Sequence, residues 1–141
     1  MSLTDSQSGC IIYHGESPAP IKLAGTVSKG DALGWAVTGG GWKRADASTD
    51  ADTAIPIHTR CVAAEDGVLD QVITAYFGLV ELGGRISGAT VGGAIYASAT
   101  AGQYTQTIPA TTGDATTVIG YATAPTRITV FANMNKESES A

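Results

Sequence analysis

The sequence predicts an all-β protein, a small barrel or sandwich of short antiparallel strands. Segments rich in apolar and β-branched residues recur about every ten residues, and turn signals separate them. Glycine is frequent, at 18 of 141 residues, and alanine and threonine are abundant beside it. This composition favours short strands and tight turns over helices. No alternation of strands with helical segments is visible, so a parallel sheet with crossover helices is not expected.

Residues 26–42 are predicted to form a β-hairpin around which the domain is built. Lys29-Gly30-Asp31 supplies a tight turn, and Ala32 to Val37 form the first strand. Glycines 39–41 make a second turn, because consecutive glycines reach backbone conformations that a side chain disfavours. None of these positions carries a catalytic group.

Residues 90–105 form a second, weaker copy of this pattern. Aligning Gly30 with Gly93 places Gly39 on Gly102 without a gap. The spacing of both turns is therefore kept, and the domain is expected to contain two related hairpin units.

The chain divides into three parts on this interpretation. Residues 1–20 are an N-terminal arm, residues 21–133 the β domain, and residues 134–141 a flexible, polar tail. The arm is polar at first and then carries a short apolar run, residues 10–13. It is expected to be flexible, and it either lies on its own domain, extends over a neighbouring subunit or stays disordered.

The remaining strands are expected where β-branched or alternating residues gather. The segment 68–82 has an ambiguous period, but its β-branched and aromatic content favours two strands that Gly78 interrupts. The other expected strands cover residues 21–27, 55–64, 118–124 and 127–133. Of the two tryptophans, Trp35 is expected in the core or in a subunit contact, and Trp42 is expected to be partly exposed.

Charge and segment composition exclude several classes of partner. The net charge is −5 and the basic residues form no stripe, which argues against nucleic-acid binding. No apolar run is long enough to span a membrane, and no signal peptide is visible, so synthesis in a cytoplasm is expected. The two cysteines, Cys10 and Cys61, are interpreted as free thiols.

No pattern for catalysis or for a bound cofactor or metal is found, and the protein is not expected to be an enzyme. The two histidines, His14 and His58, are far apart and lack ligand or triad spacing. Asp46, Asp50 and Asp52 lie in a loop without the spacing of a calcium-binding loop, so a solvated loop is the better interpretation. A loop that cradles phosphates is absent as well.

The order of several short motifs carries a resemblance to a known family. These are V-x-K-G-D-A-L, I-P-I-H, G-L-V-E-L, V-G-G-A-I-Y-A-S-A-T-A-G-Q-Y-T, V-I-G-Y-A and R-I-T-V, in this order. The chain resembles the small head-decoration, or capsid-stabilising, proteins of tailed bacteriophages over about residues 21–133. The resemblance rests on this order and on the G-x-x-Y-A-x-x-x-x-G-x-x-T element.

The resemblance implies a structural protein that is made in the host cytoplasm and ends on the exterior of the virion capsid. Its partners would be the major capsid protein and other copies of itself, usually in a homotrimer, and it would stabilise the shell. Candidate contacts with the capsid or between subunits are Cys10, Ile11, Ile12, Tyr13, Trp35 and Trp42. Removal of residues 1–20 is then expected to weaken shell attachment and to leave the fold intact.

A second hypothesis is a β-sandwich recognition module for glycans or for a host surface. A glycan site needs exposed aromatic rings and planar polar groups close together. Trp42, Tyr104 and Tyr121 are the aromatic candidates, although they are separated in the sequence.

Overall fold

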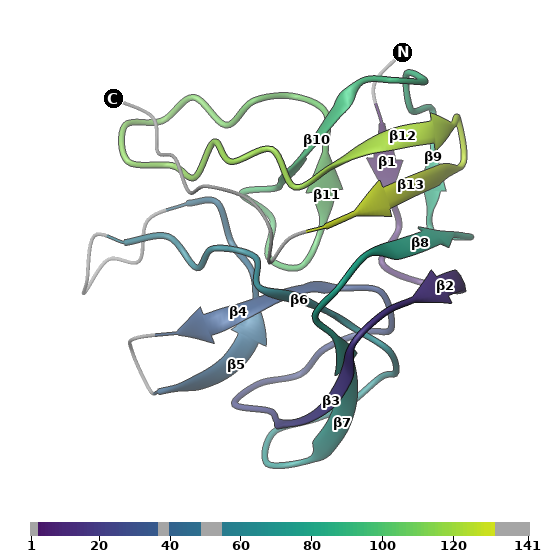
Figure 1. The fold of residues 1–141 in the computed structure, drawn as a ribbon. Helices are drawn as coiled ribbons and strands as arrows, with labels where there is room; N and C mark the ends of the chain where they lie inside the picture. The colour runs from purple at the N-terminus through teal and green to yellow at the C-terminus, as the bar shows by residue number, and fades with distance from the viewer. Residues whose placement is uncertain (1–2, 37–39, 49–54, 132–141) are drawn as a thin grey trace.

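The protein is all-β, and its short strands are antiparallel (Figure 1). The computed structural model describes residues 3–36, 40–48 and 55–131, and this part contains thirteen strands and no helix. The strands are β1 (Thr4–Asp5), β2 (Ile11–Gly15), β3 (Pro18–Lys22), β4 (Ala32–Ala36), β5 (Gly41–Arg44), β6 (Cys61–Ala63), β7 (Val72–Tyr76), β8 (Val80–Gly83), β9 (Ile86–Ser87), β10 (Ala94–Ala97), β11 (Tyr104–Thr105), β12 (Gly120–Ala124) and β13 (Arg127–Val130).

The strands form three sheets and no closed barrel, so the architecture is sandwich-like. The six-stranded sheet has the order β11-β10-β12-β13-β8-β2, and the five-stranded sheet has the order β3-β7-β6-β4-β5. The strands β1 and β9 form a small sheet of their own. In Figure 1 the six-stranded sheet lies above the five-stranded one.

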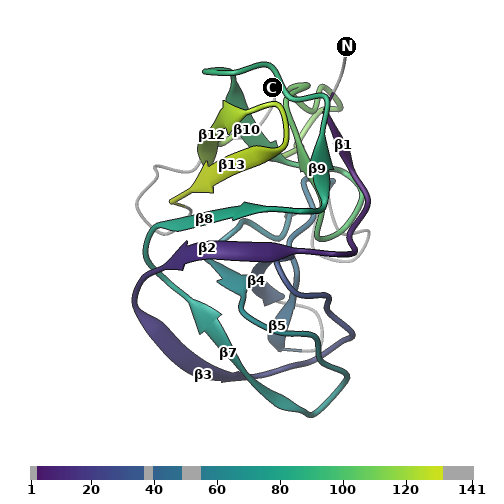
Figure 2. The ribbon, with the colours of Figure 1, turned by 90° about the vertical axis from the view of Figure 1, so that its right-hand side faces the viewer.

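One long antiparallel ribbon joins the two large sheets. The β2–β8 pair belongs to the six-stranded sheet, and its continuation, the β3–β7 pair, belongs to the five-stranded sheet (Figure 2). Backbone hydrogen bonds continue through the bend, from Glu16 N–H to Leu79 O at 3.0 Å and from Gly78 N–H to Glu16 O at 3.0 Å. A Cβ on Gly78 would lie 2.7 Å from the Glu16 side chain. Gly78 therefore interrupts the predicted segment because the ribbon turns a corner there, as strands that switch sheets do.

Two hydrophobic cores fill the molecule. The larger core contains residues of both large sheets, among them Leu82 and Ile128 of the six-stranded sheet and Val62 of the five-stranded sheet. The smaller core lies on one face of the five-stranded sheet and includes Leu23, Leu33 and Ile73, while Trp42 and Phe77 pack at its margin.

The same tight turn recurs five times within the described residues. In each turn the N–H of the fourth residue donates to the carbonyl oxygen of the first, and the third residue has a positive φ, which is the signature of a type II turn. Glycine occupies the third position in four of the five turns, and Asp70 in the remaining one has a φ of 71°. The turns are residues 28–31, 68–71, 90–93, 100–103 and 111–114.

The observed turns show that the predicted alignment of the two hairpin units is wrong by one residue. The first unit begins with the turn 28–31 and the second with the turn 90–93. Gly92, with a φ of 81°, is the counterpart of Gly30, which has a φ of 87°. The predicted pairing of Gly30 with Gly93 is therefore wrong. Strand β4 then starts at Ala32 and strand β10 at Ala94. The predicted turn at Gly39 lies outside the described residues.

The other predicted strands agree with the structure to different degrees. The segment 68–82 contains two strands, β7 and β8, as predicted. In the segment 55–64 only Cys61–Ala63 is a strand, and Ile57 makes an isolated bridge with Asp46. The predicted tail at residues 134–141 lies outside the described residues, as do Asp50 and Asp52.

The N-terminal segment is not a flexible arm in its described part but lies on its own domain. Residues 4–5 pair with β9, β2 is an edge strand beside β8, and β3 pairs with β7 across the predicted boundary at residue 20. The sequence did not indicate β2 as a sheet strand because the apolar run at residues 10–13 is so short. Residues 3–20 thus supply parts of all three sheets, and their removal is expected to disrupt the fold and not to leave it intact.

A buried ionic network fixes the N-terminal segment to both hairpin units. The side chains of Asp5, Asp31 and Arg85 have no exposed surface. Arg85 uses all five of its N–H donors. They reach both carboxylate oxygens of Asp5 at 2.6 and 2.9 Å, Asp31 at 2.8 Å, and the carbonyl oxygens of Lys29 at 3.1 Å and Gly102 at 3.2 Å.

The charges of this network balance. Arg44 is the second cation, with its Nε 2.6 Å from the carboxylate of Asp31. Burial disfavours the charged guanidinium of Arg85, yet its pKa is raised, because the hydrogen bonds with Asp5 and the charges of Asp5 and Asp31 outweigh burial. Two acids thus face two bases, of which only Arg44 is partly exposed, and the loss of Arg85 or of Asp5 leaves a buried charge short of its partner.

We expect the substitution Asp5→Ala to lower the free energy of unfolding by about 3–5 kcal/mol, because Arg85 would stay buried without its main partner. Urea unfolding at neutral pH measures this change. The matched control is Glu81→Gln, which breaks the 2.8 Å pair of Glu81 with Arg127 at the surface and should have a much smaller effect. Equal effects of the two substitutions would contradict the role given to the network.

Stability should also fall at alkaline pH because of Cys61. Burial raises the pKa of this thiol from 9.0 to about 12. The unfolded chain then loses the proton near pH 9 while the folded chain keeps it, so stability decreases between about pH 9 and 12 by up to about 1.4 kcal/mol per pH unit. Urea unfolding from pH 8 to 11 should show a shallower decrease for Cys61→Ala than for Cys10→Ala, since Cys10 is only partly buried. Parallel curves for the two variants would contradict this assignment.

Candidate binding surfaces

The six residues predicted to contact the capsid or other subunits lie in two separate places. Residues 10–13 lie at and before strand β2, whereas Trp35 and Trp42 lie on strands β4 and β5 of the other large sheet. Cys10 and Ile12 are half-buried and pack against the larger core. Only Ile11, at 49% exposure, and Tyr13, at 47%, present apolar surface there.

Strand β2 is an open edge of the six-stranded sheet. Its register with β8 shifts between Ile12 and His14, so Tyr13 stands at a bulge. The guanidinium of Arg127 lies 3.5 Å from the centre of the Tyr13 ring, and Arg127 also pairs with Glu81 at 2.8 Å. The stacked guanidinium thereby favours this position of the exposed ring.

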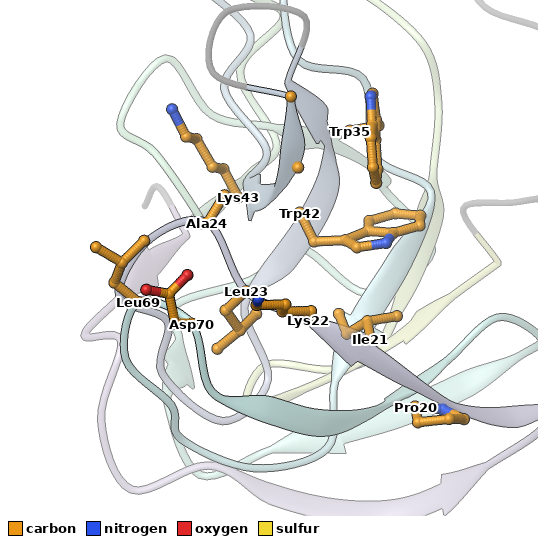
Figure 3. Close-up of a pocket in the computed structure, with 12 residues that line it drawn as sticks. Pro20, Ile21, Lys22, Leu23, Ala24, Trp35, Trp42, Lys43, Leu69 and Asp70 are labelled. Carbon is orange, nitrogen blue, oxygen red and sulfur yellow. The ribbon is translucent and has the colours of Figure 1, made fainter.

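A hollow of about 490 Å³ lies at the margin of the smaller core (Figure 3). It lies where the two edges of the five-stranded sheet approach each other. Leu23, just after β3, makes an isolated parallel bridge with Trp42 of β5, and the Ala24 N–H donates to Trp42 O at 2.8 Å. The lining residues are Pro20, Ile21, Lys22, Leu23, Ala24, Trp35, Gly40, Gly41, Trp42, Lys43, Leu69 and Asp70.

Two perpendicular indole rings form one end of the hollow. Trp35 and Trp42 are directly opposite in the β4–β5 register, and their ring centres lie 5.5 Å apart with an angle of 89° between the planes. Trp42 also meets Phe77 edge to face at 5.5 Å, and it packs against the smaller core. Trp35 is 55% exposed, so of its two expected places the core is wrong, and the subunit contact stays a prediction. The reason is its position near the outer end of the hairpin, where Trp42 and Phe77 already cover the core.

Charged groups face the aromatic end across the hollow. Figure 3 places Lys43, Leu69 and Asp70 on the side opposite the indoles. Leu69 is 60% exposed. Asp70 occupies the turn position that glycine takes in the four related turns, and aspartate tolerates this left-handed conformation better than most residues. A carboxylate thus stands where the backbone alone would favour glycine.

The residues that line the hollow were only partly predictable. Trp35 and Trp42 were singled out, and the hairpin register could have shown that they face each other. Lys22 and Leu69 carried no signal, because nothing local indicates that the two sheet edges meet. Asp70 could have been noted as well, because it is the third residue of a turn that directly precedes a strand, as the turn Ser28–Asp31 does.

The aromatic residues considered for a glycan site are not brought together. Tyr104 is buried, and its hydroxyl donates to Gly30 O at 2.7 Å, so it is excluded as a surface contact. Tyr121 is exposed, but it lies on β12 of the six-stranded sheet beside Phe131. Of the three, only Trp42 borders the hollow.

The described ranges contain no group of three or more metal-binding side chains placed to hold a metal ion. His14 lies 2.9 Å from Glu16 on the surface, and the hydrogen bond from His14 lowers the pKa of Glu16. Within residues 3–36, 40–48 and 55–131, no helix is long and apolar enough to cross a bilayer. The described surface offers exposed apolar side chains and, at the margin of the smaller core, a hollow lined by aromatic and charged residues.

Comparison with protein-family models, with curated proteins and with solved structures gives no match to this chain.

We expect the two tryptophans to differ in their effect on stability. Trp42→Ala should lower the free energy of unfolding by about 2–3 kcal/mol, because it opens the margin of the smaller core. Trp35→Ala should cost about 1 kcal/mol or less, since it removes mainly one ring contact. Urea unfolding of both variants measures the difference. A larger loss for Trp35→Ala would contradict the exposed position of this ring.

Proposed function

We propose that this protein decorates the exterior of an assembled phage capsid as an oligomer and stabilises the shell. The order of sequence motifs supports this proposal, as does the all-β fold of short strands. Its partners are the major capsid protein and other copies of the chain, most simply in a homotrimer. Its place is the outside of the virion.

The observation that carries the proposal is the amount and distribution of exposed apolar surface. Eleven large hydrophobic side chains of the described residues are between 41% and 61% exposed. Six belong to the six-stranded sheet and its connections: Ile11, Tyr13, Val91, Ile108, Val118 and Tyr121. The other five, Trp35, Ile55, Val68, Leu69 and Val72, belong to the other large sheet and its connections.

Apolar surface spread over both sheets suits a subunit that has more than one neighbour. A binder of one small ligand needs a single concave site, whereas a subunit between its copies and a shell needs contacts on several sides. Each contact can be weak, because many copies on one shell add their effects.

Strand β2 is the best candidate for one of these contacts. It is an open sheet edge, it carries the exposed Ile11 and Tyr13, and the stacking of Arg127 limits the motion of the tyrosine ring. A rigid aromatic side chain next to an aliphatic one contributes contact area at little entropic cost. A protein that binds only the assembled shell then raises the stability of that shell by linkage.

Two measurements test the proposal directly. Light scattering after size exclusion should give a multiple of the 14.3 kDa of one chain, and the protein should co-sediment with expanded empty heads of its phage. Heads that carry the protein should also resist heat better than bare heads. A monomer that fails to sediment with the heads would overturn the proposal.

The double substitution Ile11→Ser/Tyr13→Ser should weaken either co-sedimentation with heads or oligomer formation at least about tenfold, because it removes the apolar surface of the β2 edge. The control is His14→Ser on the same strand, which should leave both properties unchanged. Thermal unfolding of both variants must show that they are folded at the temperature of the assay. Unchanged oligomers and unchanged head binding in the double variant would exclude β2 as a contact.

A further inference from the structure

The hollow at Trp35 and Trp42 presents an exposed aromatic ring on a rigid support (Figure 3). Trp35 is 55% exposed, and its ring meets that of Trp42 at 5.5 Å and 89°. Trp42 in turn meets Phe77 edge to face and packs against the smaller core. A flat ligand can therefore stack on Trp35 at little entropic cost, because its neighbour already supports the ring.

Asp70 lies at the opposite end of the hollow, and the turn that contains it does not need its carboxylate. Its φ of 71° belongs to the left-handed region that favours glycine, which the four related turns have at this position. In two of those turns a carboxylate at the fourth position accepts the first N–H, whereas here the Oε1 of Gln71 accepts the Val68 N–H at 3.0 Å. An aspartate in place of glycine thus adds nothing to the closure of the turn, which points to a role outside the fold.

The charges that the hollow offers to a ligand cancel. Lys22 and Asp70 are exposed and line the hollow together, and within the described residues neither side chain has a hydrogen bond or an ion pair. Lys43 lines the hollow too, but it already has an interaction of its own and is not assigned to the ligand. One ammonium and one carboxylate leave no net charge, and the chain as a whole, at −5, repels anions. The hollow therefore favours a polar ligand without charge.

Among uncharged ligands, the lining favours a sugar over an apolar molecule or a peptide strand. An apolar molecule would cover Lys22 and Asp70 without pairing them, which costs free energy. An added peptide strand is disfavoured, because Pro20 on edge strand β3 has no N–H and Trp42 O on β5 already accepts the Ala24 N–H at 2.8 Å. A pyranose has a face of C–H groups that stacks on an indole, and its hydroxyls can donate to a carboxylate and accept from an ammonium.

We propose that this hollow binds a short neutral saccharide. One ring stacks on Trp35 in the corner that Trp42 completes, while the hydroxyls donate to Asp70 and accept from Lys22. The volume of about 490 Å³ is in the usual range for small-molecule sites. Sugar binding of this kind does not depend on capsid binding. On a shell exterior, many copies would multiply a weak affinity for a glycan-bearing surface.

Titration calorimetry and tryptophan fluorescence with cellotriose as the probe test this proposal, and trigalacturonate is the charged comparison. Cellotriose should bind saturably and at least about fivefold more tightly than trigalacturonate, and it should change the emission of the exposed Trp35. Added salt should leave the binding of cellotriose unchanged, because no net charge is involved. No saturable binding of cellotriose, or equal or tighter binding of trigalacturonate, would overturn the proposal.

Matched variants locate the site. Trp35→Ala should weaken the binding of cellotriose about tenfold, while Tyr121→Ala, which removes an exposed ring from the other large sheet, should leave it unchanged. Unchanged cellotriose binding in Trp35→Ala would overturn the assignment. If Trp35→Ala abolishes co-sedimentation with heads while the unmodified protein binds no cellotriose, the hollow is a protein contact and no saccharide site.

The substitution Asp70→Gly separates binding from stability. Glycine suits the φ of 71°, so the midpoint of thermal unfolding should stay the same or rise. The affinity for cellotriose should nevertheless fall at least about fivefold, because the carboxylate that accepts its hydroxyls is gone. A folded Asp70→Gly variant that binds cellotriose as well as the unmodified protein does would contradict the role given to this carboxylate.

Discussion

The fold depends on one buried guanidinium. Arg85 makes hydrogen bonds to the first strand, to the turn that opens the first hairpin unit and to Gly102 in a turn of the second unit. These segments are far apart in the sequence and belong to three different sheets. Gly102 fits there because a Cβ would lie 2.9 Å from the Asp31 side chain. The turns of the two hairpin units thus lie on either side of the Arg85 guanidinium, and strand β1 supplies its remaining hydrogen-bond acceptors.

Local signals in the sequence were sufficient to predict the strands and turns in which these signals occur. Turn glycines predicted the starts of β4 and β10, and β-branched and aromatic content predicted β7, all close to their observed places. They were insufficient for β1 and β2, whose pairing depends on Arg85 and on the ribbon that bends at Gly78. The one-residue error in aligning the units has a similar cause. Gly92 and Gly93 are equivalent in the sequence, and only the backbone φ shows which one makes the turn.

The surface was predictable to a smaller extent than the strands. Trp35 and Trp42 were singled out from the sequence as candidate contacts with the capsid or between subunits. Their mutual contact follows from the register, but the hollow does not, because it arises where Leu23 and Trp42 join two edges of one sheet. The exposure of Ile11 and Tyr13 follows from the edge position of β2, which the sequence did not reveal.

The two kinds of surface are compatible within one particle. A subunit that rests on a shell turns some of its surface towards the shell and its copies, and leaves the rest in solvent. The exposed apolar side chains of the six-stranded sheet are suited to contacts with the shell and with other copies, because they offer contact area without directional polar groups. The hollow differs from this surface, because its lining combines two perpendicular indoles with charged side chains. Strand β2 belongs to the six-stranded sheet, and the hollow belongs to the five-stranded sheet. A neighbour bound at the β2 edge therefore does not use the residues of the hollow.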